Sequence, residues 1–88
     1  MIRKTFVVQN QLGIHTRPAA KLVDTAKKFQ CKIHLLFNNQ IVDCKSIMGL
    51  ITLGLKKDSV FEMIFNGEDE VLAEAAIEKL INGKFGED

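Results

Sequence analysis

The hydrophobic periodicity of this chain changes repeatedly between two residues and about 3.6 residues, and that alternation limits the folds it can adopt. Apolar and polar residues alternate from Ile2 to Val8 and again over residues 60–65, which is typical of strands. Helical spacing occupies residues 16–28, residues 46–53 and a segment that begins near residue 69. With two short β-rich runs at 32–37 and 40–44, the predicted order is β-α-β-β-α-β-α. This order predicts an α+β fold: a four-stranded, mostly antiparallel sheet with three helices on one face.

The two central runs are predicted to form a β-hairpin, because Asn38 and Asn39 between them tolerate the left-handed backbone of a two-residue turn. The resulting register pairs Leu35 with Val42, Ile33 with Cys44 and, on the other face, His34 with Asp43.

Each amphipathic element has its own expected core stripe, and Ser46 and Asp69 are expected to cap the second and third helices. Gly54 is expected to end the second helix. The predicted core residues are Ile2, Phe6 and Val8; Ala19, Leu22, Val23 and Ala26; Leu50 and Leu53; Phe61, Met63 and Phe65; and Ala73, Ala76, Ile77 and Leu80.

Composition excludes several classes of protein. The 88 residues predict one domain, 1–88, and a net charge of +1 provides no basic surface for nucleic acid. The sequence has no apolar run near the roughly 20 residues of a membrane span, and its N-terminus lacks a signal-peptide core. We therefore expect a cytoplasmic protein in which Cys31 and Cys44 are reduced, buried apolar residues. No cofactor is expected.

His15 is the main candidate for chemistry, because it lies where a strand pattern ends and a helix pattern begins. Pro18 favours a helix start, so either Thr16 or Arg17 is predicted to be the cap. A helix N-terminus offers unpaired N–H groups and partial positive charge to an anion, and Arg17 adds a guanidinium suited to phosphate oxygens. A lone surface histidine would be the simpler interpretation, but this combination favours a phosphorylatable imidazole.

Two motifs carry a resemblance to a known family. Residues 13–20 (GIHTRPAA) resemble the active-site signature of HPr, the histidine phosphocarrier family of the bacterial phosphoenolpyruvate:sugar phosphotransferase system. Residues 45–50 (KSIMGL), followed by TLGL at 52–55, resemble the family's regulatory-serine signature. The resemblance covers nearly the whole chain, ends before the last few residues and implies an open-faced sandwich.

The resemblance implies a carrier rather than an enzyme. Enzyme I would phosphorylate His15 on Nδ1, Arg17 would stabilise the phosphoryl group, and an Enzyme IIA would receive it. In one branch of the family, an ATP-dependent HPr kinase/phosphorylase phosphorylates the serine equivalent to Ser46. The resemblance also places partner docking on the short helix. Ile47, Met48 and Ile51 include more apolar surface than this helix needs for its own packing, and Lys21, Lys27 and Lys45 could form a basic rim around it. We expect a monomer.

Alternatives remain at several of these positions. Ser46 could be an ordinary cap, the apolar residues of the short helix could all be core, and the lysines could form a solvated face. A regulatory HPr paralogue of the nitrogen-type branch would carry the same motifs, and a small acyl-phosphate hydrolase using Arg17 is a more distant alternative. A metal site at Cys31 and His34 is rejected, because residues three apart on a strand point to opposite faces.

Overall fold

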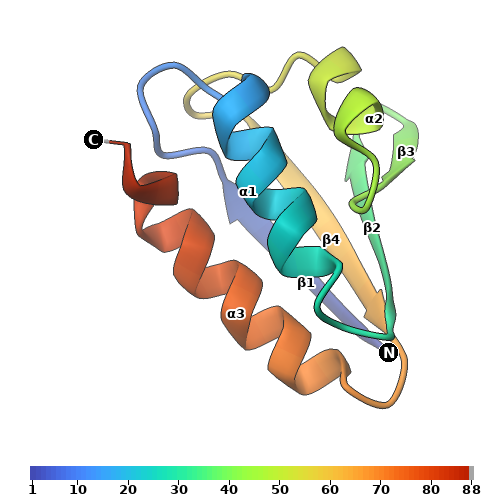
Figure 1. Cartoon of the computed structure of the whole chain (residues 1–88). Helices are drawn as coiled ribbons and strands as arrows, with labels where there is room; N and C mark the ends of the chain where they lie inside the picture. The colour runs from blue at the N-terminus through green and yellow to red at the C-terminus, as the bar shows by residue number, and fades with distance from the viewer. Residues whose placement is uncertain (88) are drawn as a thin grey trace.

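The computed structural model describes residues 1–87, and its elements follow the predicted order (Figure 1). The strands and helices are β1 Ile2–Val7, α1 Thr16–Ala26, β2 Lys32–Phe37, β3 Gln40–Asp43, α2 Ile47–Thr52, β4 Val60–Asn66 and α3 Glu70–Asn82, followed by a 3-10 turn, η1, over Lys84–Gly86.

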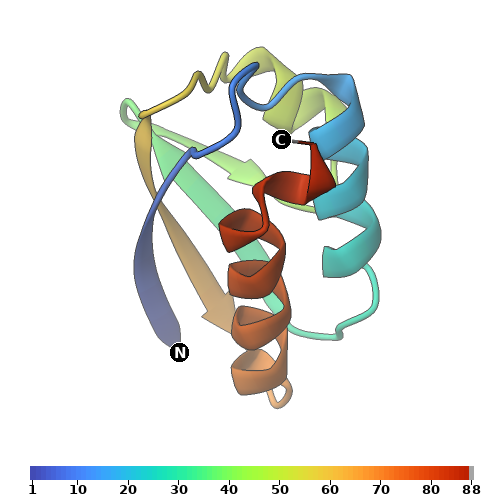
Figure 2. The ribbon, with the colours of Figure 1, turned by 90° about the vertical axis from the view of Figure 1, so that its left-hand side faces the viewer.

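The four strands form one sheet in the order β1-β4-β2-β3, and every neighbouring pair is antiparallel. The three helices cover one face of this sheet and leave the other face open, as the turned view in Figure 2 shows. The α+β class and the placement of three helices on a single face are therefore confirmed.

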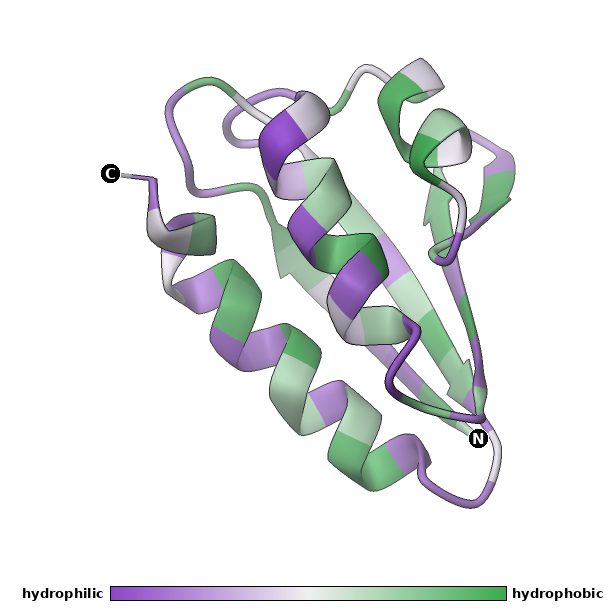
Figure 3. Cartoon of the chain, viewed as in Figure 1, coloured by the Kyte–Doolittle hydropathy of each residue, from purple (hydrophilic) through white to green (hydrophobic). Residues whose placement is uncertain are grey.

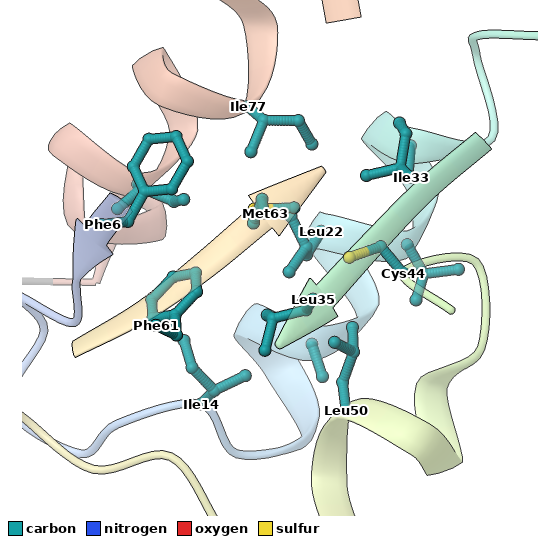
Figure 4. Packing of buried hydrophobic residues seen from close by; sticks show 14 of the residues in the cluster. Phe6, Ile14, Leu22, Ile33, Leu35, Cys44, Leu50, Phe61, Met63 and Ile77 are labelled. Atoms are coloured by element: carbon teal, nitrogen blue, oxygen red, sulfur yellow. The ribbon is translucent and has the colours of Figure 1, made fainter. Parts of the chain in front are cut away.

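The core lies between the sheet and the helices. Figure 4 shows Met63 of β4 and Leu35 of β2 facing Leu22 of α1, with Leu50 of α2 at one edge. All four side chains are buried. The strand faces and the α1 stripe were predicted correctly, because a half-buried strand and a helix with one buried face both have unambiguous apolar periodicity.

The central hairpin has the predicted register, with Leu35 opposite Val42 and His34 opposite Asp43. Asn38 and Asn39 have φ values of 52° and 64°, the left-handed conformation that a tight two-residue turn requires. Among the described residues, however, His34 and Asp43 form no side-chain hydrogen bond, and an Asp43 carboxylate oxygen instead accepts from the backbone N–H of Lys45 at 2.9 Å.

The predicted stripe of α3 was wrong in part. Ala73 and Ile77 are buried as expected, but Ala76 and Leu80 are only half-buried, and Ile81 is buried in their place. A stripe of Ala73, Ile77 and Ile81 follows a strict four-residue spacing along the helix. The sequence alone could not select it, because α3 is apolar on more than one side (Figure 3).

Candidate functional site

The loop before α1 is held against the segment that follows α2. The backbone N–H of Ile14 donates to the carbonyl of Leu55 at 2.9 Å, and the Ile14 side chain is buried. Gly13 has a φ of 72°, and a Cβ at this position would lie 2.4 Å from the carbonyl oxygen of Leu55. Only glycine fits this close approach, which explains the glycine two residues before His15.

His15 itself is the N-cap of α1, so the predicted cap at Thr16 or Arg17 was wrong. His15 has an extended backbone, with φ −86° and ψ −167°, and its carbonyl accepts the first helical hydrogen bond from the Ala19 N–H at 3.0 Å. Thr16 and Arg17 therefore belong to the first turn. Pro18 follows within that turn, where its missing N–H costs no hydrogen bond.

The N-terminus of α1 is open. The His15 side chain makes no cap hydrogen bond, and within residues 1–87 neither Thr16 nor Arg17 has an acceptor for its backbone N–H. The Arg17 side chain is exposed and forms no ion pair with the described residues. A cation at the positive end of a helix is electrostatically unfavourable, so the residues in this turn favour anion binding over helix stability.

The imidazole of His15 faces the C-terminal segment. Its Nε2 lies 3.0 Å from Oε2 and 3.2 Å from Oε1 of Glu87. The side chain of Glu87 is only 9% exposed, whereas that of His15 is 37% exposed. No other group among residues 1–87 hydrogen-bonds to the ring, so Nδ1 has no protein partner there. No local sequence pattern indicated this contact, because the two residues are 72 positions apart.

Asn10 links the loop to Glu87. It is the only buried polar or charged residue among those described; its amide donates to Gly13 O and, at 3.2 Å, to Glu87 Oε1. The remaining amide oxygen, Oδ1, is buried and has no hydrogen-bond partner among the described residues. Asn10 thus fixes both the loop that carries His15 and the carboxylate that contacts it.

The short helix α2 begins as predicted. Ser46 is its N-cap, and Ser46 Oγ accepts from the Gly49 N–H at 3.3 Å. Leu50 is buried, whereas Ile47 is 38% exposed and Met48 is 67% exposed. Ile51 packs partly against the core. Figure 1 places α2 beside the N-terminal end of α1, so these apolar side chains lie at the same end of the molecule as His15.

Two of the three lysines assigned to the basic rim use their ammonium groups within the protein. Lys45 Nζ donates to the carbonyls of Phe29 at 2.9 Å and Cys31 at 3.0 Å, which ties the start of α2 to the α1–β2 connection. Lys21 Nζ donates to the carbonyl of Phe85. Lys27 is exposed. The sequence missed these internal contacts because carbonyl acceptors leave no signature in side-chain patterns.

Neither cysteine is a candidate for covalent chemistry. Cys31 and Cys44 are buried free thiols, and burial raises the pKa of both, so they are poor nucleophiles. Within the described part of the chain, no three His, Cys, Asp or Glu side chains gather to hold a metal ion. No helix among residues 1–87 has the length and apolar character needed to cross a membrane.

Asp69 precedes α3 as predicted but does not cap it with its side chain. Its carboxylate instead accepts from the backbone N–H groups of Gln30 at 2.7 Å and Cys31 at 2.9 Å, and these bonds lower its pKa. The helix start thus supports the loop before β2.

Comparison with known proteins identifies the family. Residues 2–83 match the family model described as the PTS HPr component phosphorylation site. The chain belongs to the HPr family. The match ends before Glu87, so the contact between Glu87 and His15 lies partly outside the region that the family model covers.

Known HPr proteins are similar in sequence to this chain over its full length or nearly so. The phosphocarrier protein HPr of Treponema pallidum is 42% identical over 88 residues and covers 100% of both chains. HPr of Neisseria meningitidis serogroup A is 39% identical, covering 99% of this chain and 98% of its own. The crystal structure of HPr-C-His from Thermoanaerobacter tengcongensis, 41% identical, superimposes with a TM-score of 0.95 over 100% of this chain and 99% of its own. This chain is therefore a phosphocarrier-family component of the phosphotransferase system.

Proposed function

We propose that this HPr-family protein carries a phosphoryl group on Nδ1 of His15, received from Enzyme I and passed to an Enzyme IIA domain. The observation that carries this proposal is the open start of α1. A half-exposed imidazole there adjoins two backbone N–H groups and a guanidinium that have no partner within residues 1–87. A phosphoryl group on Nδ1 would meet donors of complementary charge there.

The chemistry is a direct transfer. The lone pair of His15 Nδ1 attacks phosphorus, and the bond from phosphorus to the donor atom of Enzyme I breaks. In the second transfer, an acceptor atom of Enzyme IIA attacks phosphorus, and the bond from phosphorus to Nδ1 breaks. The protein contributes positioning and charge stabilisation through Arg17 and the N–H groups of Thr16 and Arg17. Exposure of the site keeps these contacts few, which suits a carrier that has to release its cargo.

We assign partner docking to the apolar side chains of α2 that are exposed, Ile47 and Met48, together with the partly buried Ile51. Methionine adapts well to more than one partner surface, which a carrier with a donor and an acceptor requires. Lys27 supplies an exposed positive charge at the rim. Lys21 and Lys45 contribute to the field of this face although carbonyls already hold their ammonium groups.

We further propose that Ser46 is the target of an HPr kinase/phosphorylase. Ser46 is exposed, lies immediately before the docking residues, and presents its hydroxyl at a helix N-terminus that would stabilise an added phosphate. Added negative charge would repel an acidic partner from the same surface.

The carrier is expected to act as a monomer in the cytoplasm. Two buried thiols without a disulfide are typical of proteins in a reducing compartment. An HPr dimer from Thermoanaerobacter tengcongensis, with a TM-score of 0.79 and 41% identity, shows that a relative of this fold also forms dimers; it covers 99% of this chain and 100% of its own.

The test is incubation with phosphoenolpyruvate and Enzyme I, followed by intact mass measurement. We expect one phosphoryl group per molecule, acid-labile and alkali-stable, and no label when Enzyme I is omitted. An unchanged mass would contradict the proposal. Repeated release of phosphate by the protein alone would indicate a hydrolase instead.

A further inference from the structure

The C-terminal turn has an unusual backbone that brings Glu87 to His15. Lys84 and Phe85 both have a φ of 55°, followed by Gly86 at 72°. The left-handed region is unfavourable for residues with a side chain, and for a bulky one such as phenylalanine it is rare. Such a conformation persists only where the surrounding structure enforces it, and it often marks functional segments.

Two contacts enforce this turn. The Phe85 side chain is 2% exposed and belongs to the core, and the Phe85 carbonyl accepts from Lys21 Nζ on α1. Figure 2 shows the turn folded back from the end of α3 toward α1. The next residue after the turn is Glu87, whose carboxylate lies against the imidazole of His15. The strained turn therefore places the carboxylate of Glu87 beside the imidazole of His15.

We infer that Glu87 is a positioning residue, which holds the proton of His15 on Nε2 and so leaves the lone pair on Nδ1. This inference rests on the proposed function. An ionised carboxylate accepts hydrogen bonds and donates none, so the ring nitrogen that faces Glu87 carries the proton. The Asn10 amide donates to Oε1 of the same carboxylate at 3.2 Å, which helps to fix its orientation.

The same contact balances charge during transfer. When Nδ1 attacks phosphorus, the proton stays on Nε2 and the ring acquires positive charge, which the carboxylate of Glu87 faces. When an acceptor takes the phosphoryl group, the N–P bond breaks and its electron pair returns to Nδ1. The ring is neutral again, and no proton has moved. This corresponds to the role of a carboxylate that orients a catalytic histidine and stabilises its imidazolium.

The effect is measurable without any partner. In a proton–nitrogen correlation spectrum of the unphosphorylated protein near neutral pH, we expect a visible Nε2–H signal from His15, protected from exchange by Glu87. Glu87→Ala should abolish that signal. Glu68→Ala is the matched control, because Glu68 is exposed in the turn before α3 and its removal changes the net charge equally.

Phosphorylation by Enzyme I supplies the second readout. Glu87→Ala should slow labelling of His15 about 10-fold, the lower end of the loss measured when the carboxylate that orients a metal-bound histidine is removed. Glu87→Gln retains an acceptor oxygen without the charge and should fall between wild type and Glu87→Ala. Glu68→Ala should match wild type in both assays.

The outcomes separate the two proposals. Failure of wild type to be labelled would overturn the carrier function while the spectrum still reports on Glu87. Labelling of Glu87→Ala at the wild-type rate, or an Nε2–H signal that persists in that variant, would overturn the inference about Glu87 alone.

Discussion

The helices α1 and α2 both have an N-cap residue with an extended backbone, but only the N-cap side chain of α2 caps its own helix. At α2 the Ser46 hydroxyl accepts the N–H of Gly49, so the helix start is closed by its own cap. At α1 the His15 side chain turns toward Glu87, and no side chain in the described part of the chain caps the N–H groups of the first turn. A helix start that uses its capping residue for another contact gives up local stability and gains a site for an anion.

Substitution of Arg17, at the uncapped N-terminus of α1, is expected to have the largest effect on the rate of phosphoryl transfer. Arg17→Ala should slow phosphoryl transfer to His15 by about tenfold or more, since removal of one donor to developing charge costs at least this much in preorganised sites. Arg17→Lys should recover only part of the rate, because an ammonium lacks the planar fork of the guanidinium. A quenched time course of His15 phosphorylation by Enzyme I measures both rates.

The control for this variant is Lys32→Ala, which removes an exposed cation at the start of β2. It should be labelled at the wild-type rate. The unfolding free energy of Arg17→Ala should change by less than about 1 kcal/mol, as for most surface changes. If Arg17→Ala transfers the phosphoryl group at the wild-type rate, Arg17 has no role in transfer. If Arg17→Ala unfolds readily, the role of Arg17 is structural.

Ser46→Asp should affect transfer less strongly, through docking. The new charge lies at the N-terminus of α2, where the helix dipole favours it, so the fold should be unchanged or slightly firmer. The same charge should weaken binding to an acidic face of Enzyme I and slow labelling of His15 several-fold. High salt should reduce that inhibition, since exposed charges are screened within about 8–10 Å at physiological ionic strength. Equal rates for wild type and variant at low salt would leave Ser46 as an ordinary cap.

The smallest expected effect is on the unfolding free energy, and it compares the N-termini of α1 and α2 directly. Ser46→Ala should lower the unfolding free energy by about 1 kcal/mol, because it removes a real cap. Thr16→Ala in the first turn of α1 should change it by less than about 0.5 kcal/mol, since among the described residues the Thr16 hydroxyl caps nothing. Urea titration of the two variants measures the difference. Equal losses would show that α1 is capped in solution.

The sequence predicted those parts of the fold that depend on local patterns. The strands, the Asn38–Asn39 turn and the cap at Ser46 all follow from periodicity or from the chemistry of single residues. The predicted cap of α1, Thr16 or Arg17, lay one or two residues too late, because threonine is a usual capping residue and histidine is not.

Long-range features of the site could not be predicted in this way. The contact between His15 and Glu87 depends on burial of Phe85 and on a left-handed turn, and neither is visible in the sequence before the fold is known. The burial of Asn10 and the internal hydrogen bonds of Lys45 belong to the same class, because each depends on carbonyl or carboxylate groups from distant segments.

The most direct test of the carrier function compares the two histidines of the chain. His15→Ala and His34→Ala are each incubated with phosphoenolpyruvate and Enzyme I, and their intact masses are measured. His34 lies within strand β2 and is not itself the first residue of a helix, so His34→Ala should gain one phosphoryl group like wild type. His15→Ala should gain none. Normal labelling of His15→Ala would show that the open start of α1 is not the phosphorylation site.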